Sequence, residues 1–66
     1  VPIRDFTSRE LEVFRAAIEG ERPKELSQRL GLAVNTVYSI RTAIRTKLDI
    51  PKEVELESWI QQNWMQ

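Results

Sequence analysis

Residues 26–48, LSQRLGLAVNTVYSIRTAIRTKL, decide the fold of this chain. Leu26 and Leu30 are four residues apart, which predicts the buried side of a short helix. Gly31 follows directly and can end that helix in a left-handed conformation. Apolar residues then recur at steps of three, four and four, as expected for one side of a long amphipathic helix. These residues are Val37, Ile40, Ile44 and Leu48.

Two helices joined by a short glycine-containing turn are typical of a helix-turn-helix motif. The small side chain of Ser27 would let the two helices approach closely, and Leu32 in the turn would help to hold them together. The spacing therefore predicts this motif, although a fold by itself does not fix a function.

The rest of the chain predicts an all-α domain with four helices. The expected helices span about 7–19, 23–30, 34–48 and 52–64. Thr7 and Glu10 have the spacing of a capping box at the start of the first helix. Pro23 and Pro51 suit the first turns of the second and fourth helices. No stretch alternates long enough to predict a strand.

Composition limits the possible functions. The chain has 66 residues, enough for one domain, and its 41% hydrophobic and 30% charged residues are ordinary for a folded protein. It has no cysteine and no histidine, which excludes disulfides, the usual zinc sites and imidazole catalysis. We therefore expect no metal, no cofactor and no enzymatic activity. No apolar run is long enough to cross a membrane, and a cytoplasmic location is expected.

Charge is distributed unevenly along this neutral chain. Residues 26–48 contain no Asp or Glu, and net charge is −2 for residues 1–21, +5 for 22–47 and −3 for 48–66. An acid-free, basic segment within a neutral protein predicts a face that binds nucleic acid.

The predicted outer side of helix 34–48 has the composition of a DNA-reading surface. With the four apolar residues turned inward, hydrogen-bonding side chains occupy the opposite side. These are Asn35, Tyr38, Ser39, Thr42 and Thr46, with Arg45 flanking on one side and Thr36 and Lys47 on the other. Such a helix in a major groove would read base edges at its centre and meet phosphates at its margins.

Two stretches, FTSRELEVF and GERPKELSQRLGLAVNTVYSIRTAIRTKL, resemble the LuxR/GerE class of bacterial transcription regulators, which includes the output domains of many response regulators. VELESWIQQNW resembles the fourth helix of that class less specifically. The resemblance implies sequence-selective binding of double-stranded DNA by helix 34–48 in the major groove. It also implies a homodimer on DNA through the fourth helix. Because the sequence starts at Val1 without an initiator methionine, we expect residues 1–66 to be the C-terminal output fragment of a longer regulator. A contact with RNA polymerase is a further expectation.

Position by position, the resemblance assigns base contacts to Tyr38, Ser39 and Thr42. It assigns phosphate contacts to Lys24, Asn35, Thr36, Arg45 and Lys47. The chain departs from the class pattern at three positions. Ala33 stands where Ser or Thr usually caps the recognition helix, Ile40 replaces a frequent His, and Pro23 replaces a frequent Asn.

Several alternatives stay open on the sequence alone. Arg41 is either a DNA contact or a solvated surface charge. Trp59 is expected in the core, whereas Trp64 fits either the core or the surface. Val54, Gln61 and Met65 fall on another side of the fourth helix, where the apolar ones form a dimer face or are scattered surface residues. The alternative function is a protein-docking module, an adaptor to RNA polymerase or another protein, that does not bind DNA.

Overall fold

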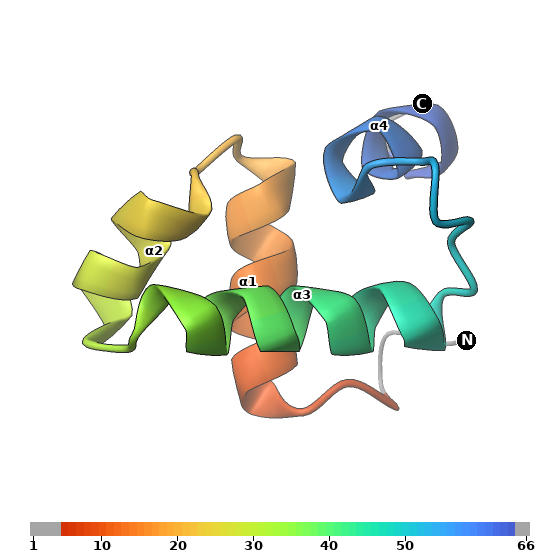
Figure 1. Ribbon diagram of the computed structural model, residues 1–66. Helices are drawn as coiled ribbons and strands as arrows, with labels where there is room; N and C mark the ends of the chain where they lie inside the picture. The colour runs from red at the N-terminus through yellow and green to blue at the C-terminus, as the bar shows by residue number, and fades with distance from the viewer. Residues whose placement is uncertain (1–4, 65–66) are drawn as a thin grey trace.

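The computed structural model describes residues 5–64, and within this range the chain forms four α-helices and no strand. The helices are α1 (Ser8–Ile18), α2 (Pro23–Leu30), α3 (Val34–Lys47) and α4 (Leu56–Asn63). Figure 1 shows α3 crossing in front of α1, with α2 and α4 on opposite sides of the crossing. The predicted all-α fold with four helices is confirmed.

The start of α1 is fixed by the predicted capping box. The Glu10 amide donates to Thr7 Oγ1 over 3.1 Å, and the Thr7 amide donates to Glu10 Oε1 over 2.8 Å. Thr7 is therefore the cap that precedes the helix rather than its first residue.

The turn between α2 and α3 has the predicted left-handed glycine. Gly31 has a φ of 71°, and the amides of Gly31 and Leu32 both donate to the Ser27 carbonyl. Ser27 is buried, as a close approach of two helices requires, and its hydroxyl donates to the Lys24 carbonyl over 2.7 Å. The buried polar group is thus satisfied within α2.

The two ends of α3 lack the residues that usually stabilise them. Ala33 has the extended conformation of an N-cap, with ψ at 146°, but its methyl group cannot accept a hydrogen bond. At the other end Asp49 has a φ of 57°, a left-handed conformation that is usually taken by glycine. The amides of Asp49 and Ile50 donate to the carbonyls of Thr46 and Arg45 and close the helix.

The predicted start of the fourth helix is wrong by four residues. The Pro51 carbonyl accepts a bond from the Val54 amide over 3.0 Å, which makes a turn rather than the first turn of a helix. Glu55 is extended, with ψ at 150°, and occupies the N-cap position of α4, which begins at Leu56. Pro51 is compatible with either conformation, so its presence alone could not decide between them.

The core lies where α1 meets α3 and α4. Its fully buried large side chains are Val13, Phe14, Val37, Ile44, Leu56 and Ile60. Ile40, Leu48 and Trp59 are partly buried and pack against this cluster. Trp64 is 49% exposed, yet its ring meets Phe14 edge to face at a centroid distance of 5.3 Å. One ring therefore belongs to both the core and the surface.

A mostly buried carboxylate joins the start of α1 to the end of α3. Glu10 Oε1, which already caps α1, lies 2.6 Å from Lys47 Nζ. The same ammonium is 5.7 Å from the centre of the Phe6 ring and donates to the Asp5 carbonyl. The hydrogen bond from Lys47, and then that from the Thr7 amide, lower the pKa of Glu10.

This contact predicts a loss of stability in acid. Because the pKa of Glu10 is lower in the folded state, its stabilising effect is complete above its ordinary pKa of 4.5 and is lost as pH falls through the lowered value. Glu10→Gln should lower the free energy of unfolding by about 1–2 kcal/mol at pH 7, and the difference should shrink below about pH 4.5. Denaturant melts of both proteins across pH 2–7 (roughly the range set by Glu titration) measure it. Glu12→Gln, which changes an exposed carboxylate of α1, is the control, and a pH-independent difference would contradict the assignment.

A better cap on α3 should stabilise the domain. Ala33→Ser places a hydroxyl where the backbone already has the N-cap conformation, and should raise the free energy of unfolding by about 1 kcal/mol. Thermal and denaturant melts provide the measurement. Ala43→Ser makes the same change in the middle of α3 and should lower stability by a few tenths of a kcal/mol. Equal effects at the two positions would refute the capping argument.

Candidate nucleic-acid interface

One side of α3 faces away from the rest of the protein. Helix α3 packs against α1 and α2, with Val37 and Ile44 fully buried between them. The side chains predicted to point outward are all exposed: Asn35, Tyr38, Ser39, Thr42 and Thr46. We call these five residues the outward face. The helical spacing therefore predicted correctly which side of α3 is buried and which is exposed.

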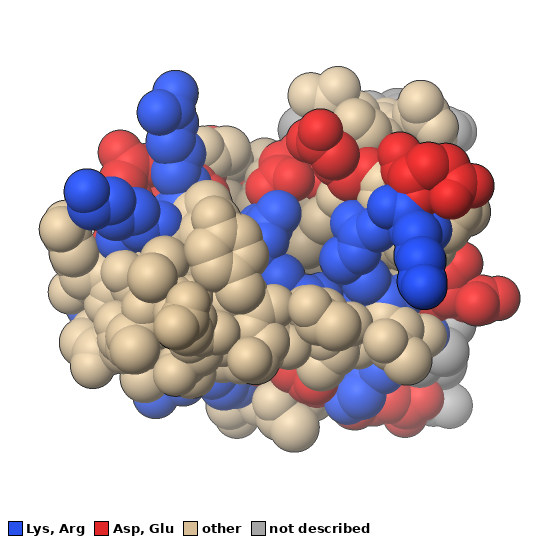
Figure 2. Space-filling model, in the orientation of Figure 1, with Lys and Arg blue, Asp and Glu red and all other residues tan. Residues whose placement is uncertain are grey.

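The outward face is polar and carries no charge. Figure 2 views the molecule with this helix in front: its surface is mainly neutral, with cationic side chains beside it, and acidic side chains gather over α4 and the preceding segment. Helix α3 itself contains no Asp or Glu. A polyanion could therefore approach this side without meeting a carboxylate on the helix.

The hydroxyl groups of the outward face can donate and accept hydrogen bonds. Thr42 Oγ1 donates to the Tyr38 carbonyl over 3.0 Å, so its lone pairs and its methyl group remain available. Tyr38 is 54% exposed. Hydroxyls, an amide and threonine methyls are groups that suit base edges in a major groove.

The start of α3 offers backbone donors. The amides of Thr36 and Val37 both donate to the Ala33 carbonyl, which leaves the amides of Val34 and Asn35 without a partner among residues 5–64. Asn35 and Thr36 have exposed side chains, and so has Lys24 near the start of α2. Such a helix start favours a negatively charged group.

Arg41 is held by α4. Its Nη2 lies 2.9 Å from both carboxylate oxygens of Glu57, and its side chain is only 16% exposed. Neither of the two open interpretations, a DNA contact or a solvated charge, anticipated this ion pair.

Lys47 and Arg45 also have partners within the chain. Lys47 pairs with Glu10, as described above, and its predicted contact with phosphate stays a prediction that competes with this pair. Arg45 Nη2 donates to the carbonyls of Pro51 and Lys52, over 3.1 and 3.2 Å. These bonds leave its positive charge without a carboxylate partner among residues 5–64.

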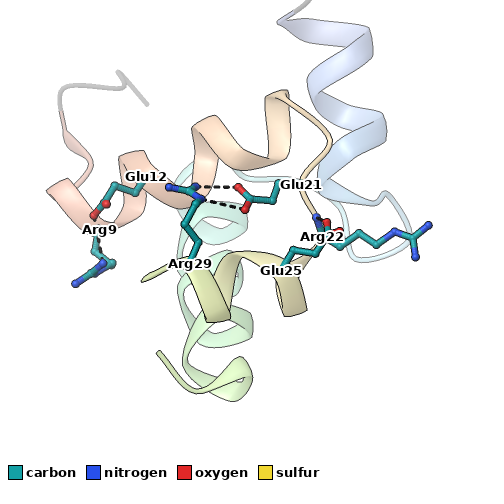
Figure 3. Close-up of polar contacts among 6 residues, drawn as sticks. All are labelled: Arg9, Glu12, Glu21, Arg22, Glu25 and Arg29. Carbon is teal, nitrogen blue, oxygen red and sulfur yellow. Dashed lines mark hydrogen bonds and ion pairs between the residues drawn. The ribbon is translucent and has the colours of Figure 1, made fainter. Parts of the chain in front are cut away.

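A fourth cation is paired on another side of the molecule. Figure 3 shows Arg29 of α2 directed at Glu21, with Nε and Nη2 each bonding one carboxylate oxygen. The hydrogen bonding between the two side chains lowers the pKa of Glu21 and raises the pKa of Arg29. Nearby, the Arg22 amide donates to the Glu25 carboxylate. This bond stabilises the start of α2, where no hydroxyl side chain serves as the cap.

The ion pairs change the explanation of the acid-free segment. Its four cations are Arg29, Arg41, Arg45 and Lys47. Three of them bind carboxylates that lie outside the segment in sequence, and only Arg45 does not. These three ion pairs offset three of the five net positive charges of residues 22–47, so the predicted basic face is weaker than the sequence indicates.

The predicted dimer face is assembled only in part. Gln61 is exposed, but Val54 is half-buried and packs against the core. Met65 lies outside the described residues.

Comparison with known families identifies the chain. The model of the family described as bacterial regulatory proteins, luxR family (GerE), matches residues 4–60. The chain belongs to the LuxR family. It is accordingly a DNA-binding, helix-turn-helix domain of transcription regulation, as the sequence predicted. No curated protein and no solved structure matched it.

Family membership bears on the outward face directly. The match covers α1, α2 and α3 completely, so the turn and the exposed residues of α3 lie within the LuxR domain. In the range 5–64, no helix has the length and apolar character needed to span a membrane.

Proposed function

We propose that this LuxR-family domain binds double-stranded DNA in a sequence-selective way, with α3 in the major groove. The outward face carries the proposal. It presents five exposed, uncharged, hydrogen-bonding side chains on a helix without acids, and its opposite side is fixed in the core. An α-helix of this kind fits a major groove, where each base pair offers a distinct set of donors and acceptors.

Tyr38, Ser39 and Thr42 are the base-reading residues in this proposal. They lie next to one another within about one helical turn, in the middle of the outward face, and all three are exposed. The Thr42 methyl and hydroxyl suit a thymine methyl and a neighbouring acceptor or donor, while the Tyr38 phenol reaches a base or a sugar.

The phosphate contacts lie on both sides of α3. Lys24, Asn35, Thr36 and the free amides at the start of α3 would bind one strand, and Arg45 the other. Arg41 and Lys47 would have to leave Glu57 and Glu10 to reach a phosphate, so we assign their main role to stability.

We also propose that two copies bind adjacent half-sites. Most cations of the acid-free segment are paired, and a single domain with few free cations gains little from counterion release. Half-sites about 34–36 Å apart would place two α3 helices in successive major grooves. Helix α4 lies at the edge of the molecule, where a second copy has access to it (Figure 1), and exposes Gln61. A contact with RNA polymerase stays a prediction.

Removing one base-reading group should change sequence preference. Thr42→Ala is expected to relax selection at one or two base pairs, by about 1 kcal/mol or about fivefold, because it removes the hydroxyl and the γ-methyl group from the outward face. Selection of bound duplexes from a random pool, followed by titration of the preferred and altered sites, measures the effect. Ser58→Ala, an equivalent loss of an exposed hydroxyl on α4, should leave the preference unchanged. An unchanged preference in Thr42→Ala would remove this residue from the reading surface.

Removing a phosphate contact should act equally on all sequences. Lys24→Gln is expected to weaken every duplex to the same extent and to reduce the slope of log K against log salt by about 0.9. Fluorescence anisotropy titrations between 50 and 200 mM salt, roughly the range over which such contacts are measured, provide the slope. Arg9→Gln is the control, because it removes a positive charge of α1 that already pairs with Glu12. The salt slope of this variant should equal that of the parent protein. A sequence-dependent loss in Lys24→Gln would mean that this lysine reads bases.

A further inference from the structure

A hollow lies beside the outward face, at the point where α3 ends. It has a volume of about 310 Å³ and opens to solvent. Its lining comes from the last turns of α3 and the loop that follows: Thr42, Arg45, Thr46, Asp49, Ile50 and Lys52. Two of these residues, Thr42 and Thr46, belong to the outward face, so a duplex read by α3 would come close to the hollow.

Arg45 fixes the shape of this hollow. Its Nη2 bonds to the carbonyls of Pro51 and Lys52 tie the loop to α3. The left-handed conformation of Asp49 and the bond from the Ile50 amide to the Arg45 carbonyl turn the chain back at the same place. The backbone of Lys52 is therefore held at a fixed position next to the helix.

The hollow has an excess of positive charge. Lys52 is exposed, and neither Lys52 nor Arg45 forms an ion pair with a described residue. Asp49 is the single acid in the lining, and the left-handed backbone turns there. In contrast, the other cations of α3 are each bound to a carboxylate. Figure 2 shows cationic side chains between α3 and the acidic region over α4.

We propose that Lys52 and Arg45 hold one phosphate of the DNA backbone in this hollow. The inference rests on the proposed function and extends it to a residue outside the recognition helix. Arg45 uses one nitrogen for the loop carbonyls and keeps Nε and Nη1 for the phosphate, while Lys52 supplies a point charge. With Lys24 on the α2 side of α3, the domain then contacts phosphates on both sides of the groove.

Two substitutions that remove charges of opposite sign, and should change DNA affinity in opposite directions, test the proposal. Lys52→Gln should weaken binding of every duplex about fivefold to tenfold near 0.1 M salt and reduce the salt slope by about 0.9, because one phosphate contact is lost. Asp49→Asn removes the acid from the hollow while keeping a residue that tolerates a left-handed conformation, and should tighten binding about twofold to fivefold. Anisotropy titrations with duplexes of unrelated sequence measure both effects.

Arg15→Gln is the matched control, because it removes an exposed cation of α1 that forms no ion pair among the described residues. It should leave the salt slope unchanged. Melting curves check that Lys52→Gln and Asp49→Asn remain folded. If Lys52→Gln keeps the parent affinity and slope while Thr42→Ala still changes preference, the hollow seats no phosphate and the proposed function stands. If the parent protein binds no duplex at any salt, both proposals fail.

Discussion

The Glu10 carboxylate is the polar contact that ties the start of α1 to the end of α3. It accepts the Thr7 amide at the start of α1 and the Lys47 ammonium at the end of α3. Packing of Val37 and Ile44 fixes which side of α3 is buried, and the ion pair adds a fixed point at its C-terminal end. A domain of this size has a small core, so a mostly buried polar contact between two helices adds to the interactions that define their arrangement.

The same use of charge shapes the interface. Carboxylates from α1 and α4 bind the cations on the flanks of α3, and the outward face is left with neutral hydrogen-bonding groups. A strongly basic helix would bind any duplex through its phosphates, whereas neutral donors and acceptors distinguish base pairs. In the proposed mode of binding, pairing most cations internally would therefore favour selectivity over affinity. The cost in affinity explains why two copies, and phosphate contacts outside α3, belong to the proposed mode of binding.

Local sequence signals predicted most of the fold. Capping at Thr7, the left-handed turn at Gly31 and the apolar spacing of α3 all depend on residues within a few positions of one another. Such signals failed at residues 52–55, where Pro51 was compatible with a helix or a turn. The turn there is held partly by Arg45, whose side chain reaches forward to the carbonyls of Pro51 and Lys52. No local pattern shows which carbonyls a guanidinium will bind.

The sequence by itself determined the four helices, the helix-turn-helix spacing and the exposed side of α3, because helical periodicity places residues on faces without knowledge of their neighbours. Only the tertiary structure decided which cations remain available to a ligand. Lys47 and Glu10 are 37 positions apart, and Arg41 and Glu57 are 16 apart. Coulomb attraction between such residues depends on distance in space, which the packing of α1 and α4 around α3 sets. The basic segment of the sequence thus forms a mainly neutral outward face with a positive hollow at one end.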